Sequence, residues 1–253
     1  MDKSNRIKST VVIVGLSYSG LAAAHKLLSQ GIDVVVVDKN PGLVPSAYYA
    51  GVEGKVYVEH RVLRDVGLET RMDAGDPRGV WIDSLELLSR LLVGIYGRKG
   101  VVITGYDIEP FFVEKNGELW FAGAILRIPS EDHGLMEDHC VVESKYLIDA
   151  SGLSAEPTIS VIESLRPGVV PQGPGPVVPG SRDVVEKTQW VIEDMILATG
   201  LAAASIFGAT LPFPDVTPLL ESGVRAADMI IESLNSIEKP RNKERIDDLY
   251  GLM

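Results

Sequence analysis

A glycine-punctuated turn near the start of the chain carries its clearest functional signal. The turn reads VGLSYSGL over residues 14–21, follows an apolar run and opens an apolar helix. Gly15 permits a tight turn, and Gly20 lets the helix pack close to the strand. Free N–H groups at the start of such a helix attract a pyrophosphate. We therefore expect a dinucleotide to be bound by Gly15, Leu16, Ser17, Tyr18, Ser19 and Gly20.

Asp38 supplies the second part of this expected site. It ends the next apolar run, where a carboxylate accepts hydrogen bonds from both ribose hydroxyls and repels a 2′-phosphate, which favours NAD or FAD over NADP. Lys39, beside it, and Ser151 and Gly152, after a later strand, are expected to contact the same cofactor. Ser17 departs from the usual pattern because it replaces the middle glycine. A glycine-rich turn without a ligand is the alternative interpretation.

A second cluster of reactive side chains lies in the middle of the chain. The sequence Glu-Asp-His occurs at 131–133 and again at 137–139, directly before the single cysteine, Cys140. Carboxylate and imidazole together suit Fe(II), Mn or Zn. Asp138 and His139 are therefore the expected metal ligands and catalytic residues, and another subunit could supply a further ligand. A solvated acidic hairpin tip is the alternative.

Two further pairs of residues are weaker candidates. Tyr48 and Tyr49 follow the second strand, where they could stack on a ring or form oligomer contacts. Arg78 and Arg182 could grip a carboxylate or phosphate, or be ordinary surface charges.

The elements that must position these residues follow from hydrophobic patterning. Strands over Val11–Val14 and Val34–Val37 flank a helix over Leu21–Gln30, which predicts parallel strands joined by a right-handed crossover. Further helices are expected over 56–66, 84–96 and 217–235, and core strands over 101–104, 146–150 and 195–199. Antiparallel strands are expected over 111–113, 119–128 and 140–142. His25 and His60 fall in predicted helices as surface or packing residues.

The predicted fold is therefore α/β: a Rossmann-like parallel sheet of the FAD/NAD-binding, GR2-type class with a small antiparallel β insertion. One domain is expected over residues 1–253, with a Pro/Gly-rich loop over 166–182 and a polar tail over 236–253. A net charge of −11 argues against nucleic acid as a partner. The single cysteine and the lack of a signal-peptide core or an unbroken apolar span indicate a cytoplasmic chain that does not cross a membrane.

The order of elements resembles that of thiamine thiazole synthase, a family whose archaeal members make an adenylated thiazole from NAD, glycine and sulfide. The resemblance covers roughly Thr10 to Ile231. It is carried by segments 9–39, 64–69, 84–92, 145–152, 195–204 and 221–230. It implies NAD as substrate or ligand, a glycine-like second substrate, Fe(II) and a homo-oligomer.

This chain departs from the family at positions that carry its chemistry. Met136 stands where the family has Cys or His, and a methionine has no ionisable thiol. Leu153 replaces an iron-binding His, and Leu211 replaces a substrate-gripping Arg. Asp138 aligns with the family's iron-binding Asp.

Three functions are compatible with these residues. The preferred one is a thiazole synthase-like transferase with altered catalytic positions. The second is an FAD- or NAD-dependent oxidoreductase, for which NAD is favoured over flavin because Gly200 is followed by Leu201 instead of an acid. The third is a nucleotide-binding protein without catalysis.

Overall fold

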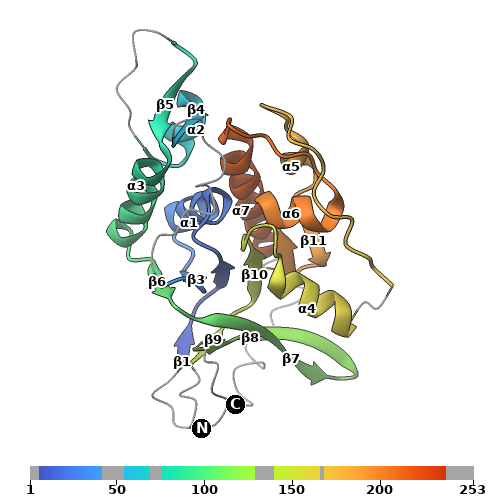
Figure 1. Cartoon of the computed structure of the whole chain (residues 1–253). Coiled ribbons are helices and arrows are strands. Elements are labelled where there is room, and N and C mark those ends of the chain that lie inside the picture. Colours follow the sequence, from blue (N-terminus) through green and yellow to red (C-terminus); the bar gives the residue numbers. More distant parts are fainter. Residues whose placement is uncertain (1–5, 42–53, 69–75, 129–139, 166–167, 238–253) are drawn as a thin grey trace.

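A mixed, mainly parallel sheet forms the centre of the molecule (Figure 1). The computed structural model describes residues 6–41, 54–68, 76–128, 140–165 and 168–237. Within these ranges the sheet has six strands in the order β11 (Gln189–Ile192), β12 (Ile196–Ala198), β10 (Tyr146–Asp149), β2 (Val11–Val14), β3 (Val34–Asp38) and β6 (Val101–Thr104). All neighbours are parallel except β11, which is antiparallel to β12. The fold is thus the predicted Rossmann-like one, with an antiparallel edge.

The central strands are continuous apolar runs because both faces of the sheet are covered. Every residue of β2 is buried, and alternate side chains enter different cores: Val11 and Ile13 one, Val12 and Val14 the other. The register pairs Val14 with both Val37 and Asp149. The carboxyl ends of β2, β3 and β10 therefore meet at one edge of the sheet.

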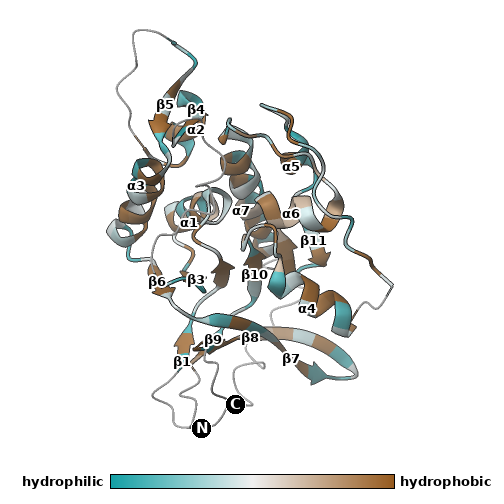
Figure 2. Cartoon of the chain, in the orientation of Figure 1, coloured by the Kyte–Doolittle hydropathy of each residue, from teal (hydrophilic) through white to brown (hydrophobic). Residues whose placement is uncertain are grey.

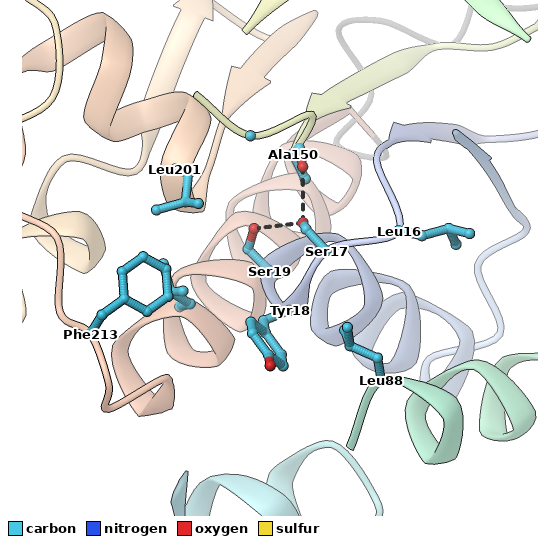
Figure 3. Close-up of a pocket in the computed structure, with 10 residues that line it drawn as sticks. Leu16, Ser17, Tyr18, Ser19, Leu88, Ala150, Leu201 and Phe213 are labelled. Carbon is cyan, nitrogen blue, oxygen red and sulfur yellow. Dashed lines mark hydrogen bonds between the residues drawn. The ribbon is translucent and has the colours of Figure 1, made fainter. Parts of the chain in front are cut away.

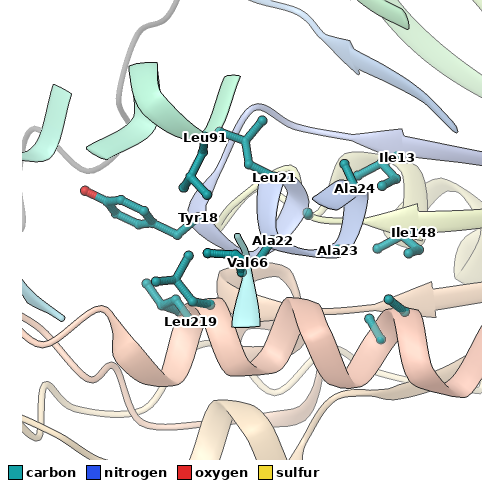
Figure 4. Packing of buried hydrophobic residues seen from close by; sticks show 14 of the residues in the cluster. Ile13, Tyr18, Leu21, Ala22, Ala23, Ala24, Val66, Leu91, Ile148 and Leu219 are labelled. Carbon is teal, nitrogen blue, oxygen red and sulfur yellow. The ribbon is translucent and has the colours of Figure 1, made fainter. Parts of the chain in front are cut away.

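Three helices cover one face of this sheet. They are α1 (Tyr18–Ser29), α3 (Ser84–Gly97) and α7 (Thr217–Ile237). Figure 4 shows the small side chains of α1 between the strand residues Ile13 and Ile148 and the neighbouring helices. Gly223 allows α7 to lie against the first turn of α1, because a Cβ there would overlap the carbonyl oxygen of Ser19.

A second sheet, together with α4 (Glu156–Leu165), packs on the opposite face. Its order is β1 (Arg6–Lys8), β9 (Cys140–Glu143), β8 (Glu118–Arg127) and β7 (Asp107–Lys115). The predicted antiparallel insertion is confirmed and is longer than expected. Strand β1 was not predicted: it pairs in parallel with β9, and its Arg6 forms a 3.0 Å ion pair with the buried Glu143.

The helix expected over 56–66 is partly wrong. Its first half is β4 (Lys55–Glu59), which pairs with β5 (Gly79–Asp83), and only α2 (His60–Asp65) is helical. Val56 and Val58 are both buried, which is the two-residue period of a strand. The two-stranded sheet formed by β4 and β5 stands at the upper left of Figures 1 and 2.

The described part of the Pro/Gly-rich segment, residues 168–182, is hydrogen-bonded along its length. The N–H groups of Gln172, Gly175 and Val178 donate to carbonyl oxygens of residues 206, 209 and 211. The segment leads into the short α5 (Asp183–Glu186), and α6 (Gly200–Phe207) lies beside it. Among the helices described here, none has the length and apolarity that a membrane crossing requires.

Candidate functional site

A cavity of about 530 Å³ opens where β2, β3 and β10 end. Its volume lies in the range of small-molecule sites. The cavity brings together seven of the residues predicted from sequence to contact a cofactor: Gly15, Leu16, Ser17, Asp38, Lys39, Ser151 and Gly152. Ligands in open α/β sheets bind at the carboxyl ends of the strands, which is where this cavity lies.

Two glycines allow the backbone to form this cavity wall. Gly15 has a φ of 108°, and a Cβ there would overlap the carbonyl of Ala150 at the end of β10. Gly20 lies in the first turn of α1, where a Cβ would overlap the carbonyl oxygen of Gly15. Each glycine thus has the role expected from the sequence: one for the turn, the other for close helix–strand packing.

Ser17 caps the helix with its side chain. Its Oγ accepts a 3.2 Å hydrogen bond from the N–H of Gly20. It also donates a 2.9 Å bond to the carbonyl oxygen of Ala150, which Figure 3 shows. A serine is a favoured N-cap because it satisfies one of the unpaired N–H groups of the first turn. The serine in place of the middle glycine therefore links α1 to β10.

The carboxylate of Asp38 is engaged mostly by the protein itself. Its Oδ2 accepts the N–H of Leu16 at 2.7 Å, and its Oδ1 accepts two bonds from Asn40, at 2.8 Å and 2.9 Å. A carboxylate has about four lone-pair positions, so about one remains for a ribose hydroxyl. Asp38 consequently also holds the glycine-rich turn in place.

Asp149, which the sequence analysis did not single out, lies beneath the floor of the cavity. It is fully buried, and burial raises the pKa of its carboxyl. The carboxylate accepts the N–H and O–H of Ser151, at 3.0 Å and 2.7 Å, and the N–H of Thr158 at 3.0 Å. It thereby shapes residues 151–158, most of which line the cavity. Its position before Ala-Ser-Gly at a strand end was the available signal.

Residues from two other elements complete the wall. Glu156, in the first turn of α4, forms an ion pair with Lys39, with 2.5 Å between Oε1 and Nζ. Tyr106, Asp107 and Ile108 line the same cavity from the start of β7. Sequence reasoning missed these residues because their partners lie far away along the chain.

On the other side of the helix terminus the space is much smaller. A cavity of about 20 Å³, enough for about one water molecule, is bounded mainly by apolar side chains, among them Leu88, Leu201 and Phe213 (Figure 3). Tyr18 and Ser19 line this cavity and not the larger one. The buried Tyr18 hydroxyl donates to Ser84 Oγ at 3.0 Å, and burial raises its pKa to about 12. The Tyr18 side chain is thus part of the core.

The weaker candidates lie away from the large cavity. Arg182 pairs with Glu221 at 2.6 Å in a separate groove of about 410 Å³ between α2, α5 and α7. Arg78 is exposed and lies 3.6 Å from Asp76. Leu211 packs against the core.

The expected metal site falls outside the described residues, since these do not include Asp138, His139 and Met136. Tyr48 and Tyr49 are outside them too. In the part of the chain that the structure describes, no three His, Cys, Asp or Glu side chains form a group that could hold a metal. Burial raises the pKa of the Cys140 thiol, which disfavours its reactive thiolate. Leu153 does line the large cavity, and it is 45% exposed.

Comparisons with known proteins agree with this geometry. Residues 8–83 match a family model described as an FAD binding domain. Thiamine thiazole synthase of Pyrococcus abyssi is 26% identical over 241 residues, covering 92% of this chain and 93% of that protein. The Methanococcus vannielii enzyme of the same name is 24% identical over 246 residues, covering 90% and 89%. The crystal structure of Thermovibrio ammonificans THI4 superimposes with a TM-score of 0.77 at 23% identity, covering 90% of each chain, which shows a shared fold.

Proposed function

We propose that this chain, a distant relative of the thiamine thiazole synthases, is an NAD-binding enzyme that retains their scaffold and has altered catalytic positions. In the family reaction, NAD loses its nicotinamide and the ADP-ribose part is condensed with glycine and sulfide. In this function NAD binds in the 530 Å³ cavity, and a glycine-like substrate binds at the open side of that cavity.

The observation that carries the proposal is the convergence of three strand ends on one cavity. Gly15, Asp38 and Ser151 each follow or end a different one of these parallel strands and line the same space. The N-terminus of α1 adds a partial positive charge to which a pyrophosphate is attracted. Of the predicted contacts, Tyr18, Ser19 and Gly20 would contribute through this helix terminus and the packing that supports it.

The chemistry of the residues does not match an iron site in the described part of the cavity. Leu153 presents only carbon where the related enzymes are expected to have a metal-binding His. Asp138 and His139 remain the proposed metal ligands and proton-transferring groups of this chain.

The test is mass spectrometry of the small molecule that the purified protein releases on denaturation, with an absorbance spectrum taken before release. An adenylated thiazole, or a glycine adduct of ADP-ribose, would support the synthase reaction. Intact NAD with no turnover, or an empty site, would overturn the enzymatic part of the proposal and leave a non-catalytic binder.

A flavin-dependent oxidoreductase is the second candidate, because residues 8–83 match the FAD binding domain model. Against it, Gly200 is followed by Leu201, where flavoproteins usually have an acid that binds the cofactor. A yellow protein that releases FAD would establish this alternative.

Asp138→Ala distinguishes the catalytic role from the binding role. We expect turnover to be lost while the affinity for NAD is unchanged, because the cavity-lining residues are intact. His139→Ala should reduce the amount of divalent metal that the protein retains, measured by elemental analysis. Turnover that survives Asp138→Ala would show that the assigned role is wrong.

A further inference from the structure

An ion pair joins two walls of the large cavity. Lys39 directly follows β3, and Glu156 begins α4, 117 residues further along the chain. The Nζ–Oε1 distance is 2.5 Å, and both side chains are about half exposed. Both residues line the cavity, so the pair lies at its margin and not in the core.

The carboxylate of Asp38, next to Lys39 in the chain, has other partners. Asp38 uses both of its oxygens on Leu16 and Asn40. In dinucleotide-binding folds the residues at this strand end determine whether the bound nucleotide carries a 2′-phosphate on its adenosine ribose. An acid accepts a hydrogen bond from a free 2′-hydroxyl, and a nearby cation accommodates a 2′-phosphate. Among the described residues that line the cavity, Lys39 is the cation at this strand end, and its ion pair with Glu156 neutralises it.

We propose that Glu156 is a specificity-determining residue, which excludes 2′-phosphorylated nucleotides by occupying Lys39. A 2′-phosphate would have to displace the Glu156 carboxylate and would meet its negative charge. Without that carboxylate, Lys39 is available to the phosphate. This inference rests on the proposed binding of an adenine dinucleotide and adds the residue that distinguishes NAD from NADP.

The test compares ADP-ribose with 2′-phospho-ADP-ribose, which differ only in that phosphate and lack the nicotinamide, by calorimetric titration. The wild type should prefer ADP-ribose. Glu156→Gln should lower the Kd for the 2′-phosphorylated ligand about fivefold, which is the size of effect expected of an exposed charge pair. The Kd for ADP-ribose should be nearly unchanged. Adding Lys39→Met to Glu156→Gln should abolish this gain in affinity for the 2′-phosphorylated ligand. High salt should reduce it, because salt screens exposed charges.

Glu86→Gln is the matched control. Glu86 pairs with Arg90 on α3, is similarly exposed, and its change alters the net charge equally without touching the cavity. The role of Glu156 would be overturned by an equal gain in affinity for the 2′-phosphorylated ligand in Glu86→Gln. It would also be overturned by no such gain in Glu156→Gln when the wild type binds ADP-ribose, and in both cases the proposed nucleotide site would stand. Failure of the wild type to bind either ligand would overturn the proposed nucleotide site as well.

Discussion

The hydroxyl of Ser17 donates a 2.9 Å hydrogen bond to the carbonyl oxygen of Ala150, which joins the first turn of α1 to the end of β10. These residues are separated by 133 positions in the chain. The same hydroxyl accepts the N–H of Gly20. One side chain therefore fixes the relative positions of two segments of the candidate nucleotide site.

Ser17→Ala is expected to lower the free energy of unfolding by about 1–2 kcal/mol, because it removes a helix cap and a donor to Ala150. Denaturant unfolding measures the change. Ser164→Ala is the control: Ser164 is exposed, and its hydroxyl bonds only within its own helix, to Ser160. Equal stability losses in the two variants would contradict the linking role of Ser17.

Gly15→Ala is expected to prevent normal packing of the turn and to abolish nucleotide binding. A Cβ there would overlap the Ala150 carbonyl, at a φ of 108°. Gly31→Ala separates the two effects, because Gly31 has a φ of 73° and open space around it. We expect it to cost about 1–2 kcal/mol, from backbone conformation alone. Thermal unfolding and ADP-ribose titration test both variants, and a smaller stability loss in Gly15→Ala than in Gly31→Ala would contradict the prediction.

His25 should make the stability of the α1–α3 interface sensitive to pH. It is buried, and its Nε2 lies 2.7 Å from the carbonyl oxygen of Leu91 while its Nδ1 contacts Arg98. Arginine has no acceptor, so Nδ1 accepts and Nε2 donates in the neutral ring. Burial lowers the pKa of His25 in the folded state, and the Arg98 charge lowers it further.

The unfolded chain therefore takes up a proton near pH 6.5 that the folded chain resists. Stability should fall as the pH decreases from about 6.5 to the folded pKa, by at most about 1.4 kcal/mol per pH unit from this residue. His25→Gln should remove that part of the slope in urea unfolding between pH 8 and pH 5. An unchanged slope would show that His25 does not resist protonation.

Asp149→Asn should destabilise the floor of the cavity. The amide group of asparagine would place its own N–H groups opposite an N–H or O–H donor that Asp149 now satisfies, and a buried donor left without a partner costs about 1–3 kcal/mol. Asp83→Asn is the control, because Asp83 caps α3 and asparagine caps helices equally well. We expect Asp149→Asn to weaken ADP-ribose binding and Asp83→Asn to leave it unchanged.

The Asp149 carboxyl should make stability depend on pH in the direction opposite to that of His25. Its pKa is raised in the folded state, so the stabilisation from its protonated form is complete below the unfolded value of about 4 and is lost as the pH rises through the folded pKa. Unfolding measured upward from pH 4 should show this loss in the wild type and not in Asp149→Asn. Identical profiles would contradict it.

Several elements could be predicted because their signals are local. The apolar runs of β2 and β3 and the intervening helix follow from residue type and spacing within about thirty positions. The helix α3 follows from its repeat of leucines in the same way. Strand β4 was predicted as helix because its partner residues on β5 lie 20 to 28 positions further along the chain, and this pairing outweighs the local pattern.

The sequence by itself determined the nucleotide-binding half of this protein: a glycine turn, a helix start and an acid, placed by chain connectivity at one sheet edge. Only the tertiary structure decided how those groups are used. The bonds from Ser17 to Ala150, from Thr158 to Asp149 and between Lys39 and Glu156 join segments that no local pattern relates. The reason is physical: hydrogen bonds and charge pairs act over a few ångströms in space, and only the folded chain brings such distant residues within that range.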